Sequence, residues 1–292
     1  MQDNATAKKI MLLAAKIRRD IVMMVGGNGQ TGHIGGSCSS ADLVAALYGA
    51  KMRHRPADPL WDGRDRFIFS KGHAAIAQYA ALAECGYIPM EELKTCKELG
   101  SRLQGHPDRL KTPGIEAGTG SLGQGLSIAN GLALAMRLDG KQNTVYCLMG
   151  DGELAEGQIW EAAMAASYYK LGNVVGIVDR NRLQAMGAVS DRFDTDPLPE
   201  KWESFGWHVI QIDGHCVKAI LEALDKADEF EDKPVVIIAE TVKGKGISFA
   251  ENVVSFHNGA LSMEQYETAL AELDAQIDTL NIAVNGGASN NE

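Results

Sequence analysis

The sequence predicts an α/β fold, a doubly wound and mostly parallel sheet with helices on both faces. Apolar runs rich in Val and Ile recur along the second half of the chain, and helical segments separate them. Continuous apolar runs are typical of strands covered on both faces, as in parallel sheets. No internal repeat and no linker divides residues 1–292 into parts with separate cores, so we expect a single domain. The runs are 144–150, 173–179, 207–213 and 234–241.

The N-terminal region predicts two helices. Apolar residues repeat with a helical period from Ile10 to Ile21, and the glycine-rich stretch 26–37 ends this helix. A second helix is expected at about 40–52, before a polar turn that contains two prolines.

A short strand and two helices follow. Residues 66–73 predict a strand whose end carries Ser70, Lys71 and His73, and the alanine-rich segment 74–85 predicts a helix. A long loop rich in glycine and proline then leads to a helix that we expect to begin near Ser121 and to end at about Leu138. Its many glycine and alanine residues would allow another backbone to approach closely.

The C-terminal region predicts two more helices. One begins near Val217 and separates the last two apolar runs. The other covers about 262–282, where Ser262 and Gln265 form a candidate capping box. Residues 285–292 have the composition of a frayed tail.

Composition excludes several classes of protein. The formal net charge of -10 argues against a nucleic-acid binder and against binding to acidic membranes, because both need a basic face. No apolar segment is long enough to span a membrane, and residues 1–20 lack the features of an export signal. The five cysteines are scattered and contain no C-x-x-C pair, which favours a reducing, cytoplasmic location.

Polar side chains follow two of the apolar runs at the point where each run ends. Asp151 and Gly152 follow the first run, and Asn181 follows the second. Ligands of open parallel sheets bind beyond the carboxyl ends of the strands. If these two strands are neighbours, Asp151 and Asn181 can bind one Mg²⁺ or Ca²⁺ ion through oxygen atoms, and Mg²⁺ commonly completes its coordination with phosphate. The sequence therefore indicates a diphosphate ligand, although the same residue types also occur in simple turns.

These stretches resemble the thiamine diphosphate signature of the transketolase family. The signature is G-D-G, here at Gly150, followed about thirty residues later by an asparagine, here Asn181. Five further motifs occur in the order typical of the family and extend the resemblance over nearly the whole chain. They are GHIGGS at Gly32, SKGH at Ser70, GHP at Gly105, GTGSLGQG at Gly118 and FHNGAL at Phe256.

The resemblance implies that the cofactor is thiamine diphosphate, bound through Mg²⁺ or Ca²⁺. The implied metal ligands are the side chains of Asp151 and Asn181 and the carbonyl group of Leu183. Glycine at position 152 leaves room for the diphosphate, and a helix that begins near Gln158 directs its positive end toward it. The residues placed against the cofactor are His73, Gly120, Ser121, Leu122, Gly150, Asp151, Gly152, Glu153, Asn181 and His257.

The resemblance also implies catalytic residues. Four histidines beside glycines would bind the sugar and move protons while a C–C bond breaks, whereas an isolated loop histidine is usually only solvated. Glu156 matches a glutamate that joins a carboxylate network across a subunit contact. The four histidines are His33, His73, His106 and His257. The remaining three, His54, His208 and His215, match no motif and are expected to be structural or solvated.

The resemblance covers only the diphosphate-binding part of a transketolase. The family glutamate that activates the cofactor lies in a second, pyrimidine-binding domain, which this sequence does not contain. We therefore expect the N-terminal subunit of a split transketolase, working with a C-terminal subunit in a heterotetramer of two copies of each. The reaction implied is reversible transfer of a two-carbon ketol unit from a ketose to an aldose, with a sugar or sugar phosphate as substrate.

Other functions remain open from the sequence. Deoxyxylulose phosphate synthases and dehydrogenase E1 components share the cofactor, but the motifs at Ser70 and Phe256 favour transketolase. Residues 118–123 also fit G-x-G-x-x-G, the pattern of an NAD-dependent oxidoreductase, but that pattern needs a strand directly before it, and residues 106–117 contain two prolines and no apolar run. A catalytically silent assembly subunit of the same fold is the third possibility.

Overall fold

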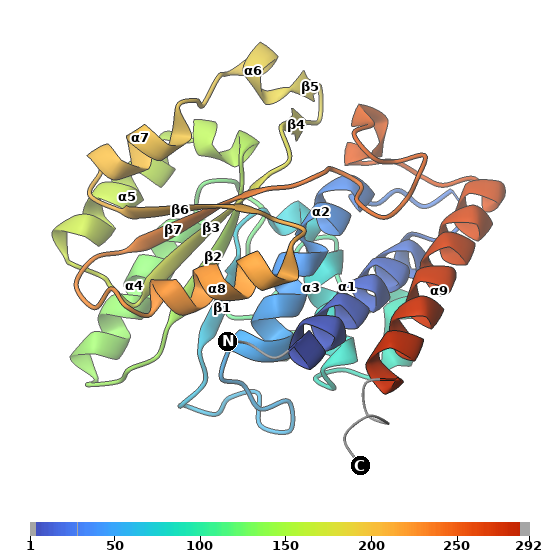
Figure 1. The fold of residues 1–292 in the computed structure, drawn as a ribbon, viewed down its shortest axis with the longest axis horizontal. Helices are drawn as coiled ribbons and strands as arrows, with labels where there is room; N and C mark the ends of the chain where they lie inside the picture. The colour runs from blue at the N-terminus through green and yellow to red at the C-terminus, as the bar shows by residue number, and fades with distance from the viewer. Residues whose placement is uncertain (1–3, 28, 287–292) are drawn as a thin grey trace.

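The computed structural model describes residues 4–27 and 29–286. Its centre is a five-stranded parallel sheet with the strand order β1-β2-β3-β7-β6 (Figure 1). The predicted fold class and all five predicted strands are confirmed. The strands are β1 (Arg66–Phe69), β2 (Val145–Gly150), β3 (Val174–Arg180), β6 (His208–Asp213) and β7 (Val235–Glu240).

Helices cover both faces of the sheet and produce two apolar cores (Figure 1). Consecutive residues of a strand point to opposite faces, so Phe67 lies in one core and Ile68 in the other. The larger core is formed with α1 (Asn4–Val25), α2 (Ile34–Ala46), α3 (Ile76–Glu84), α8 (Val217–Ala227) and α9 (Met263–Asn285). The smaller core is formed with α4 (Gly125–Leu138), α5 (Gly157–Tyr168) and α7 (Leu198–Ser204).

Short elements lie at the carboxyl edge of the sheet and in the loops. A two-stranded antiparallel hairpin follows β3, and a single helical turn follows the hairpin. The hairpin is β4 (Leu183–Gln184) with β5 (Gly187–Ala188), and the turn is α6 (Val189–Arg192). The remaining short helical segments are η1 (Leu47–Lys51), η2 (Gly72–Ala74), η3 (Met90–Thr95), η4 (Gly152–Ala155) and η5 (Val254–His257).

Two predicted helix starts are wrong, both because of glycine. Helix α2 begins at Ile34, earlier than predicted, and contains Gly35 in its first turn. A β-carbon at Gly35 would lie 2.9 Å from Cγ of Lys243, so glycine there allows close packing and does not end a helix. Helix α4 begins later than predicted, at Gly125, because Gly123 has a φ of +83° that a regular helix cannot contain.

The edge strand β6 also differs from expectation. Its residues are half-buried or exposed, whereas those of β2 and β3 are almost all buried. Among the described strands it pairs with β7 alone, at the edge of the sheet. Its incomplete burial shows that the prediction that every apolar run is covered on both faces is wrong for 207–213.

The C-terminal helix agrees with the prediction. The side chain of Ser262 accepts a hydrogen bond from the backbone of Gln265, and the Gln265 side chain accepts one from the backbone of Ser262, so the capping box is confirmed. Helix α9 continues to Asn285, slightly beyond the predicted end, and most of the predicted tail, 287–292, lies outside the described residues. Among the helices described, none is long and apolar enough to cross a membrane.

Candidate active site

A cavity of about 190 Å³ lies at the carboxyl ends of the central strands. Strands β2 and β3 are neighbours, as predicted, and Gly150 of β2 is paired in register with Asp179 of β3. The cavity therefore lies where ligands of open parallel sheets bind. Nine of the predicted site residues line it, namely His73, Leu122, Gly150, Asp151, Gly152, Glu153, Asn181, Leu183 and His257.

The three predicted metal ligands have oxygen atoms at this cavity. Asp151 is buried and accepts hydrogen bonds from the backbone N–H groups of Gly152 and Arg182. Asn181 accepts one through Oδ1 from the backbone N–H of Leu183, at 3.2 Å. The Leu183 carbonyl accepts one from Nζ of Lys243, at 2.6 Å. A cationic group thus already lies against the third predicted ligand.

This donor set fits a hard divalent cation. Within 4–27 and 29–286, no cluster of three or more His, Cys, Asp and Glu residues has the arrangement of a metal site. One carboxylate, one amide oxygen and one carbonyl suit Mg²⁺ or Ca²⁺, which take oxygen ligands. Burial, together with the charge of Asp179, raises the pKa of Asp151 to about 6, and the backbone N–H donors and the charge of Lys71 offset this rise only in part.

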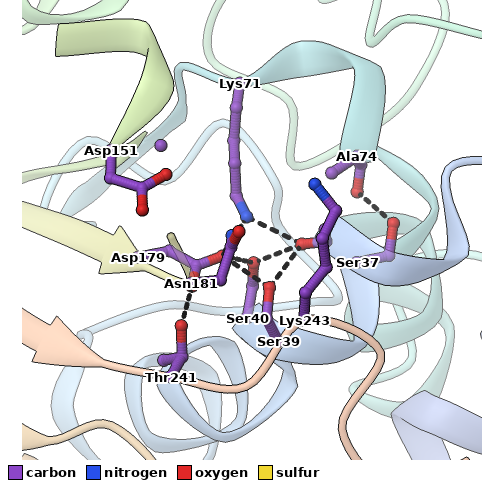
Figure 2. Close-up of polar contacts among 12 residues, drawn as sticks. Ser37, Ser39, Ser40, Lys71, Ala74, Asp151, Asp179, Asn181, Thr241 and Lys243 are labelled. Carbon is purple, nitrogen blue, oxygen red and sulfur yellow. Dashed lines mark hydrogen bonds and ion pairs between the residues drawn. The ribbon is translucent and has the colours of Figure 1, made fainter. Parts of the chain in front are cut away.

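A buried carboxylate beneath the cavity holds several chain segments together (Figure 2). Asp179 has no exposed surface, and hydrogen bonds and an ion pair reach it from five side chains. Burial alone would raise the pKa of Asp179, but the charge and hydrogen bond of Lys71 hold it below its ordinary value. We call this group the Asp179 cluster, which consists of Asp179 with Ser39, Ser40, Lys71, Asn181 and Thr241.

The Asp179 cluster orients a predicted metal ligand. The amide nitrogen of Asn181 donates to Oδ2 of Asp179 at 3.3 Å, which leaves the amide oxygen of Asn181 for other partners. The sequence places Asp151, Lys71 and Asn181 at predicted strand ends but indicates no role for Lys71 or Asp179. No pattern in the sequence indicated that Ser39 and Ser40 of α2 reach the same carboxylate.

Lys243 is a second lysine at the cavity, and no sequence motif indicated it. Its Nζ atom lies 2.6 Å from the Leu183 carbonyl and 2.8 Å from Nδ1 of His257. Burial, together with the charge of Lys71, lowers the pKa of Lys243 to about 8. The only signal in the sequence was a lysine- and glycine-rich turn directly after the last strand.

Glu153 anchors the glycine-rich loop beside the cavity. Its carboxylate accepts hydrogen bonds from the backbone N–H groups of Gly123 and Gly150 and from the hydroxyl of Ser70. Burial raises its pKa. In this structure Glu153 therefore fixes the loop to the end of β2.

Three of the four predicted histidines form one cluster. The ring centroids of His33, His73 and His257 lie 4.9 to 5.6 Å apart. Burial lowers the pKa of His33 and of His257 to about 4, with further lowering by Lys97 and Lys243 respectively. The pKa of His73 is lowered by burial and by Lys71. All three rings are therefore neutral at pH 7.

The remaining predicted residues are not among those that line the cavity. His106 is exposed and lies against Gly120, where an added β-carbon would come within 2.7 Å of the imidazole. Ser121 is also exposed. Glu156 is exposed at the N-terminus of α5, and its β-carbon lies against Gly123.

The three histidines outside the motifs are hydrogen-bonded or packed. His54 contacts the Tyr48 carbonyl, and His208 stacks on Phe230. His215 bridges Asp42 and the backbone of Val242.

Taken together, these features define an α/β enzyme subunit whose cavity, at the carboxyl edge of a parallel sheet, suits a small anionic ligand. The sequence profile of the family described as "Transketolase, thiamine diphosphate binding domain" matches residues 10–280. The chain belongs to this family. No strand precedes residues 118–123 directly, which removes the context that a dinucleotide-binding loop requires.

Relatives of subunit length are matched almost completely. The chain is 44% identical to the 6-deoxy-6-sulfo-D-fructose transketolase subunit SqwG of Clostridium sp., over 90% of this chain and 95% of that protein. It is 41% identical to a subunit of the apulose-4-phosphate transketolase of Phocaeicola vulgatus, over 94% of this chain and 97% of that protein. It thus corresponds to the N-terminal subunit of a split transketolase.

Longer transketolases are matched only in part. The human transketolase is 40% identical over 85% of this chain but over only 40% of its own length. The crystal structure of the Campylobacter jejuni transketolase superimposes with a TM-score of 0.82 at 31% identity, over 98% of this chain and 47% of that one. The chain therefore spans about half the length of the solved transketolases it matches.

Proposed function

We propose that this chain binds the diphosphate end of thiamine diphosphate and, with a partner subunit, transfers a two-carbon ketol group reversibly from a ketose to an aldose. One observation carries the proposal. Asp151, Asn181 and the Leu183 carbonyl line the same cavity, beside Lys71 and Lys243. Oxygen ligands for a cation and positive charges for an anion are thus available together, as a metal–diphosphate group requires.

The residues divide into two groups by their contacts. Asp151, Asn181 and the Leu183 carbonyl would hold Mg²⁺ or Ca²⁺, and the two lysines would supply positive charge toward the diphosphate. A β-carbon at Gly152 would come 2.7 Å from Cγ of Gln184, so glycine is the residue that fits at this wall of the cavity. Gly120, Ser121 and Leu122 would contact the cofactor through the glycine-rich loop that Glu153 anchors.

The histidines would bind the sugar substrate and take part in proton transfer. When bound, thiamine diphosphate supplies the nucleophilic carbon that this chemistry needs, and the protein supplies orientation and proton transfer. His33, His73 and His257 are neutral at pH 7, so each ring has one N–H that can donate a hydrogen bond and one nitrogen that can accept one; at His257 the accepting Nδ1 atom faces Lys243. His106 would contact the sugar from the side of the glycine-rich loop.

The partner would complete the site. We propose a C-terminal subunit with the pyrimidine-binding domain and an assembly of two copies of each chain, with Glu156 at the subunit contact and residues 1–292 forming one cofactor-binding domain in the cytoplasm. The names of two relatives support a substrate with an anionic group, because one acts on a sulfonated fructose and the other on a sugar phosphate.

A thermal unfolding experiment tests cofactor binding. Thiamine diphosphate with Mg²⁺ is expected to raise the Tm of the chain, whereas NAD is expected to leave it unchanged, because ligands stabilise only the state that binds them. The Asp151→Asn variant should lose most of this rise, since it removes the one carboxylate of the proposed metal site. A Tm that responds to NAD, or to neither ligand, would contradict the proposal, and the second result would favour a catalytically silent subunit.

A further inference from the structure

We infer that His215 is a positioning residue that fixes the backbone segment Thr241–Lys243 and thereby holds Lys243 in the cavity. The effect on ligand binding rests on the proposed function, whereas the effect on the backbone does not. His215 belongs to none of the family motifs noted in the sequence, and it lies just after the end of β6, outside the residues that line the cavity.

The hydrogen bonds of His215 require a single form of the ring. Its Nδ1 atom lies 2.7 Å from Oδ2 of Asp42, and its Nε2 atom lies 2.8 Å from the backbone nitrogen of Val242. A backbone N–H can only donate, so Nε2 must be the accepting nitrogen, and Nδ1 then carries the proton that is donated to Asp42. The neutral Nδ1–H tautomer satisfies both contacts at once.

A buried ion pair anchors the other end of this chain of contacts. The carboxylate of Asp42, on α2, is also bound by both terminal nitrogens of Arg18, on α1. Arg18 and Asp42 are 4% and 6% exposed. Burial alone would raise the pKa of Asp42, but Arg18 and the hydrogen bond from His215 hold it below its ordinary value. His215 is therefore held from a charged, fixed point in the core.

The segment that His215 holds directs two side chains into the site. The hydroxyl of Thr241 donates to Oδ1 of Asp179, within the Asp179 cluster (Figure 2). The ammonium group of Lys243 reaches the Leu183 carbonyl and His257. Val242 lies between them, and its backbone N–H is the one that His215 accepts.

Contacts on either side of Val242 explain how the His215 ring affects the position of the Lys243 side chain. The Thr241 side chain fixes one end of the segment, and the backbone N–H of Gly244, which donates to the Gly35 carbonyl at 3.0 Å, fixes the other. Without an acceptor at position 215, the half-buried N–H of Val242 would lose its partner, and the segment would rotate to find water or another acceptor. A rotation at Val242 moves the Cα–Cβ direction of Lys243 and so its ammonium group.

Three variants separate positioning from general stability. His215→Leu removes the acceptor, while His215→Gln keeps an oxygen that can accept from Val242. His54→Leu is the matched control, because His54, like His215, makes one hydrogen bond to the backbone and one to a side chain, and its partners Tyr48 and Tyr87 do not line the cavity. The measurements, on the full chain, are amide hydrogen exchange at Val242 and Lys243 and calorimetric binding of inorganic pyrophosphate with Mg²⁺.

We expect His215→Leu to increase exchange at Val242 and Lys243 and to weaken pyrophosphate binding about tenfold, the effect typical of residues that orient ligands. His215→Gln should restore most of both losses, and His54→Leu should bind as wild type does. In a Lys243→Met background, His215→Leu should cause no further loss of affinity, because both changes remove the same contact.

Three results would overturn the inference. They are unchanged exchange at Val242 in His215→Leu, equal weakening in His54→Leu, and full additivity with Lys243→Met. A wild-type chain that binds neither pyrophosphate nor thiamine diphosphate would contradict the proposed function instead, and the exchange of Val242 would still decide whether His215 positions the segment.

Discussion

At the residue scale, the partners of a buried carboxylate decide its charge, and burial alone does not. Asp179 is fully buried, yet Lys71 and several hydroxyl donors keep its pKa low. Asp20, on α1, is 2% exposed and has an oxygen with no hydrogen-bond partner. Burial, with a contribution from Glu84, raises the pKa of Asp20 to about 7. The two residues are buried to nearly the same extent and differ in the charged and hydrogen-bonding groups around them.

The substitution Asp20→Asn is expected to stabilise the chain in a pH-dependent way. Between the ordinary pKa of 3.8 and the folded value of about 7, the folded state binds more protons than the unfolded state, so Asp20 reduces stability as the pH rises through this range. The gain from Asp20→Asn should therefore grow from pH 4 to pH 7 and then stay constant, at about 2–4 kcal/mol. Urea unfolding at several pH values measures it.

A matched control is Asp274→Asn. Asp274 forms an exposed ion pair with Arg19, on the same helix as Asp20, so its replacement should change stability by less than about 1 kcal/mol. A gain for Asp20→Asn that is the same at pH 5 and pH 8 would contradict the assigned ionisation.

At the scale of elements, glycines decide where helices begin. A sequence pattern cannot tell a glycine that allows close packing within a helix from one whose positive φ ends the helical conformation. Four apolar runs and the short segment 66–73 predicted all five strands, and for β2, β3 and β7 burial on both faces left that direct signal in the composition. The start of α2 was missed because Gly35 serves close packing against Lys243, a contact between residues far apart in the chain. Gly123 does break the pattern, and it does so because its φ is positive.

Alanine substitutions at two glycines, one just before α4 and one within it, are expected to have opposite effects on stability. In Gly123→Ala, the added β-carbon would lie 2.7 Å from that of Glu156 at a φ of +83°, which should destabilise the chain by about 1–3 kcal/mol. In Gly131→Ala, inside the helix, no atom lies within 4 Å of the new carbon, so higher helix propensity should stabilise by about 0.5–1 kcal/mol. Denaturant unfolding of both variants measures the difference, and equal effects would show that backbone conformation at Gly123 is unimportant.

At the scale of the whole molecule, the site was predictable where strand ends mark it and unpredictable where distant segments meet. Asp151 and Asn181 were found because parallel strands end at one edge of the sheet. Lys243 and Ser39 were not, because they reach the site from the loop after β7 and from α2, and sequence spacing says nothing about such encounters. His215 was expected to be structural or solvated, yet it contacts the same loop.

The proposed assembly predicts how activity depends on the partner. The chain alone should transfer no ketol groups, because the half of the site that activates the cofactor is expected on the other chain. The C-terminal subunit, added in increasing amounts, should raise the rate until the two chains are equimolar and no further, as measured with thiamine diphosphate and Mg²⁺ in excess. Turnover by the isolated chain at about one per second or more would contradict the split arrangement.

The Asp179 cluster joins segments that are widely separated in the chain, from Ser39 to Thr241. No contiguous fragment of the chain shorter than about two hundred residues contains all of its members. The cluster consequently forms only once nearly the whole polypeptide has folded, so a chain released early from the ribosome, or cut within this span and separated, would lack the contact that orients Asn181.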